Sequence, residues 1–166
     1  MAKSAETSDG AARLVAYKAG NPPAEMLLTI KLVLAARLWR ARVDERLRPV
    51  GHSSSRMETL GAIAASPADS TQSDVARRLR IEGPSLTRMV QLLEKEHLIA
   101  RQADPADARS KLLALTDKGE TALDEIFALS DAMRLALLDG IDPATLAVVE
   151  GFLDEIIRRL DEAGGL

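Results

Sequence analysis

The sequence has 166 residues, 46% apolar content and only 2% aromatic residues, which indicates one domain, or a small one with extended arms, built on a helical core of Leu, Ala, Val and Ile. It has no cysteine, which excludes disulfides, thiol catalysis and cysteine-ligated metals. It also has no bilayer-spanning or signal-type apolar run, so we expect a soluble, cytoplasmic protein without a membrane partner. The net charge of −3 is uneven, since residues 24–111 hold 15 basic and 11 acidic side chains whereas residues 112–166 hold 4 and 12.

The amino-terminal part is predicted to be a tail followed by a long helix. The pair Pro22-Pro23 disfavours helix immediately before it, and we predict a mobile tail over residues 1–23. From Ala24 to about Arg48, apolar residues recur at helical spacing in two stripes. A helix that is apolar on two sides must contact two surfaces, so we assign residues 24–50 to a first dimerisation helix. The stripes are Leu27, Ile30, Leu34 and Leu38 on one side and Leu28, Leu32, Trp39, Val43 and Leu47 on the other.

Three short helices are predicted next, over residues 57–66, 72–80 and 84–96. Thr71 and Asp74 are three residues apart and match a capping box at the start of the second helix. Pro84 stands at the first helical position of the third, where proline is favoured, and a turn that contains Gly83 separates the two. The second and third helices therefore form a helix-turn-helix.

A change of period after these helices predicts a hairpin, or wing. Residues 98–103 and 111–115 can pair as two strands around a polar loop over residues 104–109. We therefore predict a mainly α fold with a winged helix-turn-helix domain over residues 51–116.

Two long helices are predicted to follow the wing. Thr116 can cap the first, which ends at Asp139-Gly140. Asp142-Pro143 opens the last helix, whose apolar residues alternate in steps of three and four, the spacing of a packing seam. We assign residues 117–166 to carboxyl-terminal dimerisation helices.

Two runs carry a resemblance to a known family. The run LTRMVQLLEKEHLIAR covers residues 86–101, and the run DPADARSKLLALTDKG covers residues 104–119 and includes Asp107 and Arg109. With the order of elements over about residues 24–162, they resemble the multiple-antibiotic-resistance regulator (MarR) family of bacterial winged-helix transcription factors. The first run is similar to the family's recognition helix and the second to its wing. The start of the recognition helix, Glu82 to Leu86, is most similar to the SlyA-like branch.

The chain departs from the family pattern at two positions. The family commonly has glycine where His97 stands, so His97 must adopt that backbone shape itself, or the helix ends differently. The wing commonly carries two successive arginines after the aspartate, and here the first is Ala108. DNA affinity would then depend more heavily on Arg109.

Helical spacing gives the predicted recognition helix a buried and an exposed face. With Leu86, Val90 and Leu93 turned inward, five polar residues turn toward solvent. An arginine can donate two hydrogen bonds to a guanine edge, and a glutamine can pair with adenine. The alternative is an ordinary solvated helix face. The candidate DNA-binding residues on this helix are Ser85, Thr87, Arg88, Gln91 and Lys95.

The wing adds Asp107, Arg109 and Lys111 to the candidate DNA-binding residues. Arg109 lies at the predicted hairpin tip, where it can enter a minor groove, and Asp107 can orient it by an ion pair. The alternative is a surface ion pair worth less than about 1 kcal/mol. A homodimer would present two recognition helices to half-sites one DNA turn apart, so we expect a pseudo-palindromic double-stranded operator.

The resemblance also implies a repressor that is relieved by a small aromatic or phenolic anion, bound between the dimer helices and the winged domain. Trp39, His52, Arg56 and Met57 lie near the expected junction and can supply a stacking surface, a titratable group and an anion partner. The simpler interpretation is that Trp39 and Met57 belong to the core and that Arg56 is a surface charge.

Other functions find less support in the sequence. It has no Gly-rich phosphate loop, no metal-binding histidine motif and no defensible Ser/His/Asp set, so we predict no enzyme and no cofactor. His52 and His97 are the only histidines, and we predict no metal site. The remaining alternative is a winged helix used only for protein–protein contacts, without sequence-specific DNA binding.

Overall fold

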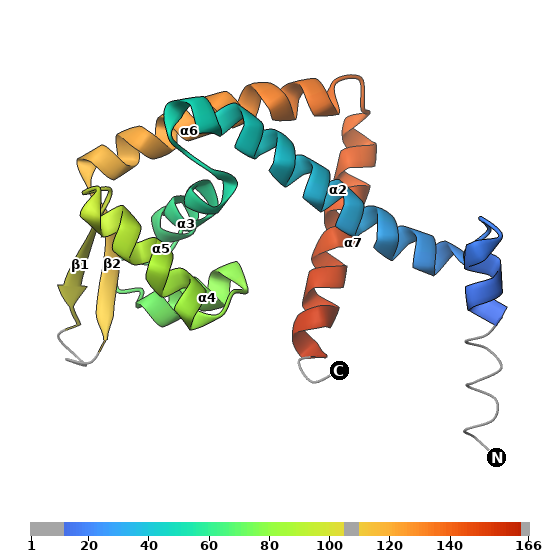
Figure 1. Cartoon of the computed structure of the whole chain (residues 1–166), viewed down its shortest axis with the longest axis horizontal. Coiled ribbons are helices and arrows are strands. Elements are labelled where there is room, and N and C mark those ends of the chain that lie inside the picture. The colour runs from blue at the N-terminus through green and yellow to red at the C-terminus, as the bar shows by residue number, and fades with distance from the viewer. Residues whose placement is uncertain (1–11, 105–109, 164–166) are drawn as a thin grey trace, which may run out of the picture. The chain divides into compact units, whose positions relative to one another are not determined.

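The computed structural model describes residues 12–104 and 110–163 in two compact units, one ending at Ile126 and the other beginning at Phe127 (Figure 1). The prediction of a mainly α fold with a helix-turn-helix and a two-stranded wing is confirmed. In chain order the elements are α2 (Ala24–Leu47), the 3-10 helix η1 (Arg48–Val50), α3 (Ser54–Ala64), α4 (Gln72–Leu79), α5 (Gly83–Lys95), β1 (Ile99–Ala103), β2 (Lys111–Leu115), α6 (Asp117–Leu138) and α7 (Pro143–Glu162).

A further short helix, which the sequence did not predict, covers residues 12–18 within the segment expected to be a mobile tail. Gly20 takes a left-handed conformation with φ 75°, and the N–H of Asn21 donates to the carbonyl oxygen of Ala16 at 2.9 Å. These two features close the helix end. Proline restricts only the residue directly before it, which here is Asn21. A helix that ends at residue 18 is therefore compatible with Pro22.

Only the carboxyl-terminal end of α2 is buried in the chain. Val43 and Leu47 are fully buried and Trp39 is half-buried, where α2 contacts α3. The apolar side chains nearer the start of α2 are 37% to 57% exposed. A single copy of the chain therefore leaves a long apolar surface on α2 uncovered; its members are Leu27, Leu28, Ile30, Leu32, Val33, Leu34 and Leu38.

Local hydrogen bonds define the start of the helix-turn-helix. The predicted capping box is present, because the N–H of Thr71 donates to Asp74 Oδ2 at 2.9 Å and the N–H of Asp74 donates to Thr71 Oγ1 at 3.3 Å. Arg80 does not continue α4 as predicted but takes a left-handed conformation with φ 55° and ends it. Pro84 is the second rather than the first residue of α5, since Gly83 begins the helix. Proline is tolerated there because that N–H has no acceptor within the helix.

The wing is tied to the helix-turn-helix as well as to itself. β1 and β2 pair antiparallel, with Ile99 opposite Leu115. On the other side of β2, the N–H of Leu113 donates to the carbonyl oxygen of Ser70 at 3.2 Å. Thr71 pairs with Leu112 of β2 as an isolated antiparallel bridge. This second attachment fixes the wing relative to the start of α4, and the sequence did not predict it.

The core of the first unit draws on α2, α3, α4, α5, the wing and the first turns of α6. Because α5 buries three of its side chains completely in this core, its opposite face points outward. The large apolar side chains that are less than 2% exposed are Val43, Leu47, Leu60, Val75, Leu86, Val90, Leu93 and Ile126.

The second unit contains the end of α6 and all of α7. Asp142 caps α7 as predicted, accepting a hydrogen bond from the N–H of Thr145 at 3.1 Å. No residue of α7 is buried, and Val148, Phe152 and Leu160 are 73%, 43% and 64% exposed. This helix also leaves an apolar surface uncovered in a single copy. Across residues 12–104 and 110–163, no helix is long and apolar enough to cross a membrane.

Candidate nucleic-acid interface

The outward face of α5 carries four of the five polar residues predicted for it. Ser85, Arg88, Gln91 and Lys95 are exposed. They are spaced by three or four residues and therefore form one row along the helix, opposite the buried Leu86, Val90 and Leu93. This row, which we call the reading row, combines hydroxyl, guanidinium, amide and ammonium groups. Such groups hydrogen-bond to base edges and phosphates.

Thr87, the fifth predicted residue, differs from the reading row. It is half-buried, and its hydroxyl donates to the carbonyl oxygen of Gly83 at 2.9 Å while accepting from Gln72 Nε2 at 2.7 Å. A hydroxyl has one proton to donate, and here that proton is used within α5. Thr87 thus links α5 to Gln72, the first residue of α4. Gln72 was not predicted as a site residue.

Three arginines on and after α4 line a groove of about 620 Å³ with Ser70 and Asp74. Arg77 forms an ion pair with Asp74 at 3.0 Å. Hydrogen bonds from Thr71 are the main cause that lowers the pKa of Asp74, and the charge of Arg77 contributes. These arginines belong to the basic interval of the sequence, but only the fold places Arg77, Arg78 and Arg80 along one groove.

The structure describes the predicted wing residues only in part. Lys111 is exposed at the start of β2, opposite Ala103 at the end of β1. Asp107, Ala108 and Arg109 lie outside the described residues, so their predicted roles stay predictions.

The turn after α5 is made by a histidine in a glycine-like conformation. His97 has φ 59°, its N–H donates to the carbonyl oxygen of Glu94 at 2.9 Å, and the N–H of Leu98 donates to that of Leu93 at 2.9 Å. This pair of hydrogen bonds is a Schellman motif, which glycine normally completes. The expectation that His97 must take this backbone shape is confirmed, at a steric cost of roughly 1–2 kcal/mol.

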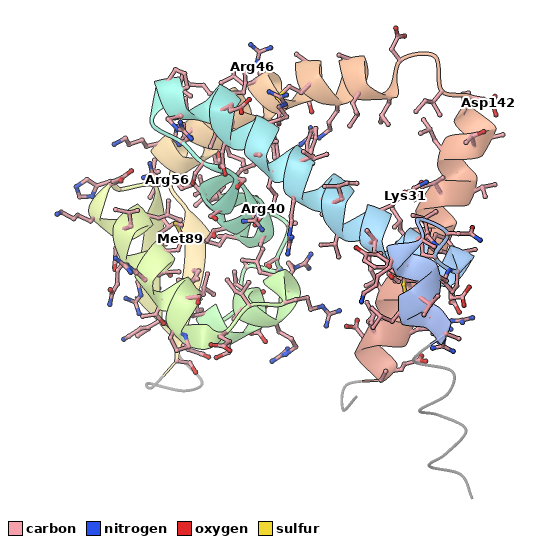
Figure 2. All side chains as sticks on the ribbon, turned by 45° about the vertical axis from the view of Figure 1, so that its right-hand side comes forward. Lys31, Arg40, Arg46, Arg56, Met89 and Asp142 are labelled. Atoms are coloured by element: carbon pink, nitrogen blue, oxygen red, sulfur yellow. The ribbon has the colours of Figure 1, made fainter. Side chains whose placement is uncertain are left out.

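The residues predicted to bind a ligand are partly engaged within the chain. Met57 lies in the core and Trp39 is half-buried. The Arg56 side chain, which is labelled in Figure 2, is 12% exposed. It forms an ion pair with Glu96 and donates to the carbonyl oxygen of Gly51 at 2.6 Å.

His52 lies in the electrostatic field of Arg56, and the structure leaves its Nδ1 buried without a hydrogen-bond partner. Burial is the main cause that lowers the pKa of His52. The positive charge of Arg56 adds to this shift and Glu125 opposes it.

We predict that this histidine destabilises the fold in acid. The unfolded chain binds a proton at His52 near pH 6.5, whereas the folded chain binds it only at lower pH. The free energy of unfolding therefore falls as the pH decreases below about 6.5. The free energy of unfolding, measured with urea at pH 7.5 and at pH 5.5, is expected to differ less between the two pH values for His52→Gln than for the wild type. Equal differences for the two proteins would contradict the assignment.

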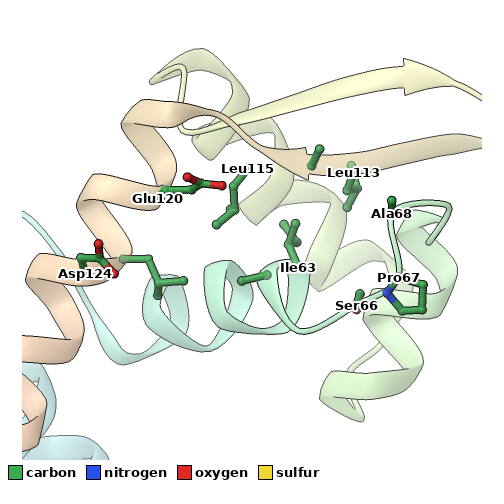
Figure 3. A pocket seen from close by; sticks show the side chains of 11 residues that line it. Ile63, Ser66, Pro67, Ala68, Leu113, Leu115, Glu120 and Asp124 are labelled. Carbon is green, nitrogen blue, oxygen red and sulfur yellow. The ribbon is translucent and has the colours of Figure 1, made fainter.

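A separate pocket of about 500 Å³ lies between the end of α3, β2 and the start of α6 (Figure 3). Ile63, Leu113 and Leu115 form an apolar wall, and Glu120 and Asp124 stand at its edge. None of the predicted ligand-binding residues lines it. In the part of the chain that the structure describes, no three His, Asp or Glu side chains gather as a metal site requires.

A helix-turn-helix, a two-stranded wing and a polar row on the exposed face of the second helix define a winged-helix protein. A sequence model of the MarR family matches residues 53–110. The structure of the transcriptional regulator PA3341 shares 32% sequence identity over 81% of this chain and 98% of that one, with a TM-score of 0.73. This chain belongs to the MarR family, whose members regulate transcription rather than catalyse reactions.

Two further solved structures are similar to this chain. The M. tuberculosis transcriptional regulator MOSR, in complex with DNA, shares 28% identity over 83% of this chain and 98% of that one, with a TM-score of 0.64. CouR from Rhodococcus jostii, bound to p-coumaroyl-CoA, is similar in fold, with 24% identity over 78% of this chain and 90% of that one and a TM-score of 0.70.

Proposed function

We propose that the chain is a homodimeric regulator that binds pseudo-palindromic double-stranded DNA, with α5 in the major groove and the wing in the minor groove. The observation that carries the proposal is the reading row, which stands outward from a helix whose other face is held in the core. The related MOSR structure contains DNA. Arg78 and Arg80, which line the groove along α4, add positive charge for contacts with phosphates.

The uncovered apolar surfaces of α2 and α7 support the dimer. A monomer in water rarely leaves apolar areas of this length exposed. A second copy with two-fold symmetry can cover both surfaces and set two α5 helices at adjacent major grooves. We therefore keep residues 24–50 and 117–166 as dimerisation helices, and residues 51–116 as the DNA-binding domain.

The regulator is proposed to repress transcription until a small aromatic or phenolic anion binds near Trp39, His52, Arg56 and Met57. The buried Arg56 Nε and His52 Nδ1, which lack hydrogen-bond partners, support an anion there, since buried polar atoms are normally paired. The structure of CouR holds p-coumaroyl-CoA. The sequence from Glu82 to Leu86 supports the SlyA-like branch.

Selection from random duplexes with the purified protein tests the proposal, with fluorescence anisotropy against salt on the selected sequence. A pseudo-palindrome with a steep salt dependence is expected. Sedimentation at micromolar concentration is expected to give a dimer. A protein that selects no sequence would instead favour a winged helix used for protein–protein contacts.

The variant Arg88→Ala tests, in the same binding experiment, whether Arg88 contacts a base. The loss of a bidentate base contact costs about 1–3 kcal/mol, so affinity for the selected duplex should fall by roughly 5- to 150-fold and base preference at one position should relax. Glu58→Ala is the control, because Glu58 of α3 lies outside the proposed dimerisation helices and the reading row. It makes only an exposed pair with Arg40 at 3.4 Å, so its loss should leave affinity unchanged. Equal behaviour of the two variants would contradict the role of Arg88.

A further inference from the structure

Two acidic residues stand at the end of α5 where the helix itself does not favour them. Glu94 lies in its last turn and Glu96 follows directly as the C-cap. The carboxyl end of a helix carries partial negative charge, which disfavours acidic side chains. Their position therefore calls for partners outside α5.

Each of the two glutamates pairs with an arginine of a different element. Glu96 forms an ion pair with Arg56 of α3, and Glu94 pairs with Arg101 of β1 at 3.4 Å. The Arg56 and Arg101 side chains are 12% and 26% exposed, whereas Arg42 in a surface pair is 71% exposed. In both pairs the arginine is thus largely shielded from solvent, whereas the Glu96 and Glu94 side chains are 38% and 44% exposed. Partial burial of a pair reduces its screening by salt.

The first turn of α6 holds the same end of α5. Lys118 Nζ donates to the carbonyl oxygen of Glu96 at 2.8 Å, and Thr116 Oγ1 donates to that of His97 at 2.7 Å. These bonds satisfy carbonyls that a helix end leaves without partners. The end of α5 is therefore fastened to α3, β1 and α6 at once, while its reading row stays clear of all three.

From this geometry we infer that Arg56, through Glu96, is a positioning residue that sets the direction of α5 for DNA recognition. Arg56 uses its guanidinium on Glu96 and on the carbonyl oxygen of Gly51. Glu96 is three residues after the buried Leu93 and so lies on the inner side of α5. The inference rests on the proposed function, because a positioned reading row matters only to a protein that reads DNA.

The test compares Arg56→Gln and Glu96→Gln with the wild type on the selected duplex and on an unrelated one. Each variant should lose affinity for the selected duplex by at least about tenfold, because misaligned base contacts cost as much as mismatched bases. The salt slope should stay at the wild-type value, since no phosphate contact is removed. The double variant Arg56→Glu with Glu96→Arg should recover most of the affinity. Glu58→Gln, which breaks the exposed pair of this α3 residue with Arg40, should change nothing.

Three outcomes would overturn the inference. Unchanged affinity in both single variants would show that the pair does not position α5. A salt slope lowered by about one, with equal loss on both duplexes, would make Arg56 a phosphate contact. Failure of the double variant to recover any affinity would exclude the pairing as the cause. If Arg56→Gln does not fold by circular dichroism, Glu96→Gln carries the test, because Glu96 is more exposed. A wild-type protein that selects no sequence would instead refute the proposed function.

Discussion

Leu93→Ala is expected to lower the free energy of unfolding by about 2–5 kcal/mol. The Leu93 side chain is fully buried on the inner face of α5, in line with Leu86 and Val90. Its truncation leaves a cavity beneath the helix that carries the reading row. The measurement is urea unfolding at one fixed protein concentration, because any dimer makes the apparent stability depend on concentration.

The neighbouring Leu92 provides a matched control for this substitution. It is the same residue type in the same helix, but its side chain is 43% exposed. Leu92→Ala is expected to change stability by no more than about 0.5 kcal/mol. Similar losses of stability in the two variants would mean that α5 does not pack through the face of Leu86, Val90 and Leu93.

Gly119→Ala is expected to destabilise the first unit by about 2 kcal/mol, although alanine is the better helix former. A Cβ at Gly119 would lie 1.9 Å from the carbonyl oxygen of Leu98 and 2.9 Å from its carbonyl carbon. Both atoms belong to the backbone, which cannot turn away as a side chain can. Overpacking of this kind costs typically about 1–3 kcal/mol, and occasionally more. It outweighs the gain of roughly 1 kcal/mol in helix propensity.

Gly151→Ala serves as a control, because it gives the gain in helix propensity without a steric clash. Gly151 lies within α7, and nothing stands within 4 Å of the position of an added Cβ. This variant should be as stable as the wild type or more stable, by up to about 1 kcal/mol. Thermal unfolding of both variants gives the comparison, and a loss at Gly151 equal to that at Gly119 would contradict the close approach of α6 to Leu98.

Much of the candidate site was predictable because its signals are local. The capping box of Thr71 and Asp74 needs only four residues to form. Helical spacing alone separates Arg88 and Gln91 from the buried Leu93. The left-handed turn at His97 followed from the departure of this one residue from the family pattern. By contrast, the helix closed at Gly20 was not predicted, although its end is an equally local motif.

The remaining features depend on segments that meet only when the chain folds. Composition and spacing by themselves determined the order of the elements, the wing and the outward face of α5, because backbone and capping preferences act within a few residues. Only the tertiary structure decided that Thr87 bonds Gln72, that Arg56 meets Glu96 across 40 positions, and that Gly119 must admit the backbone of Leu98. These contacts join residues far apart in sequence, and their formation depends on how the whole core packs.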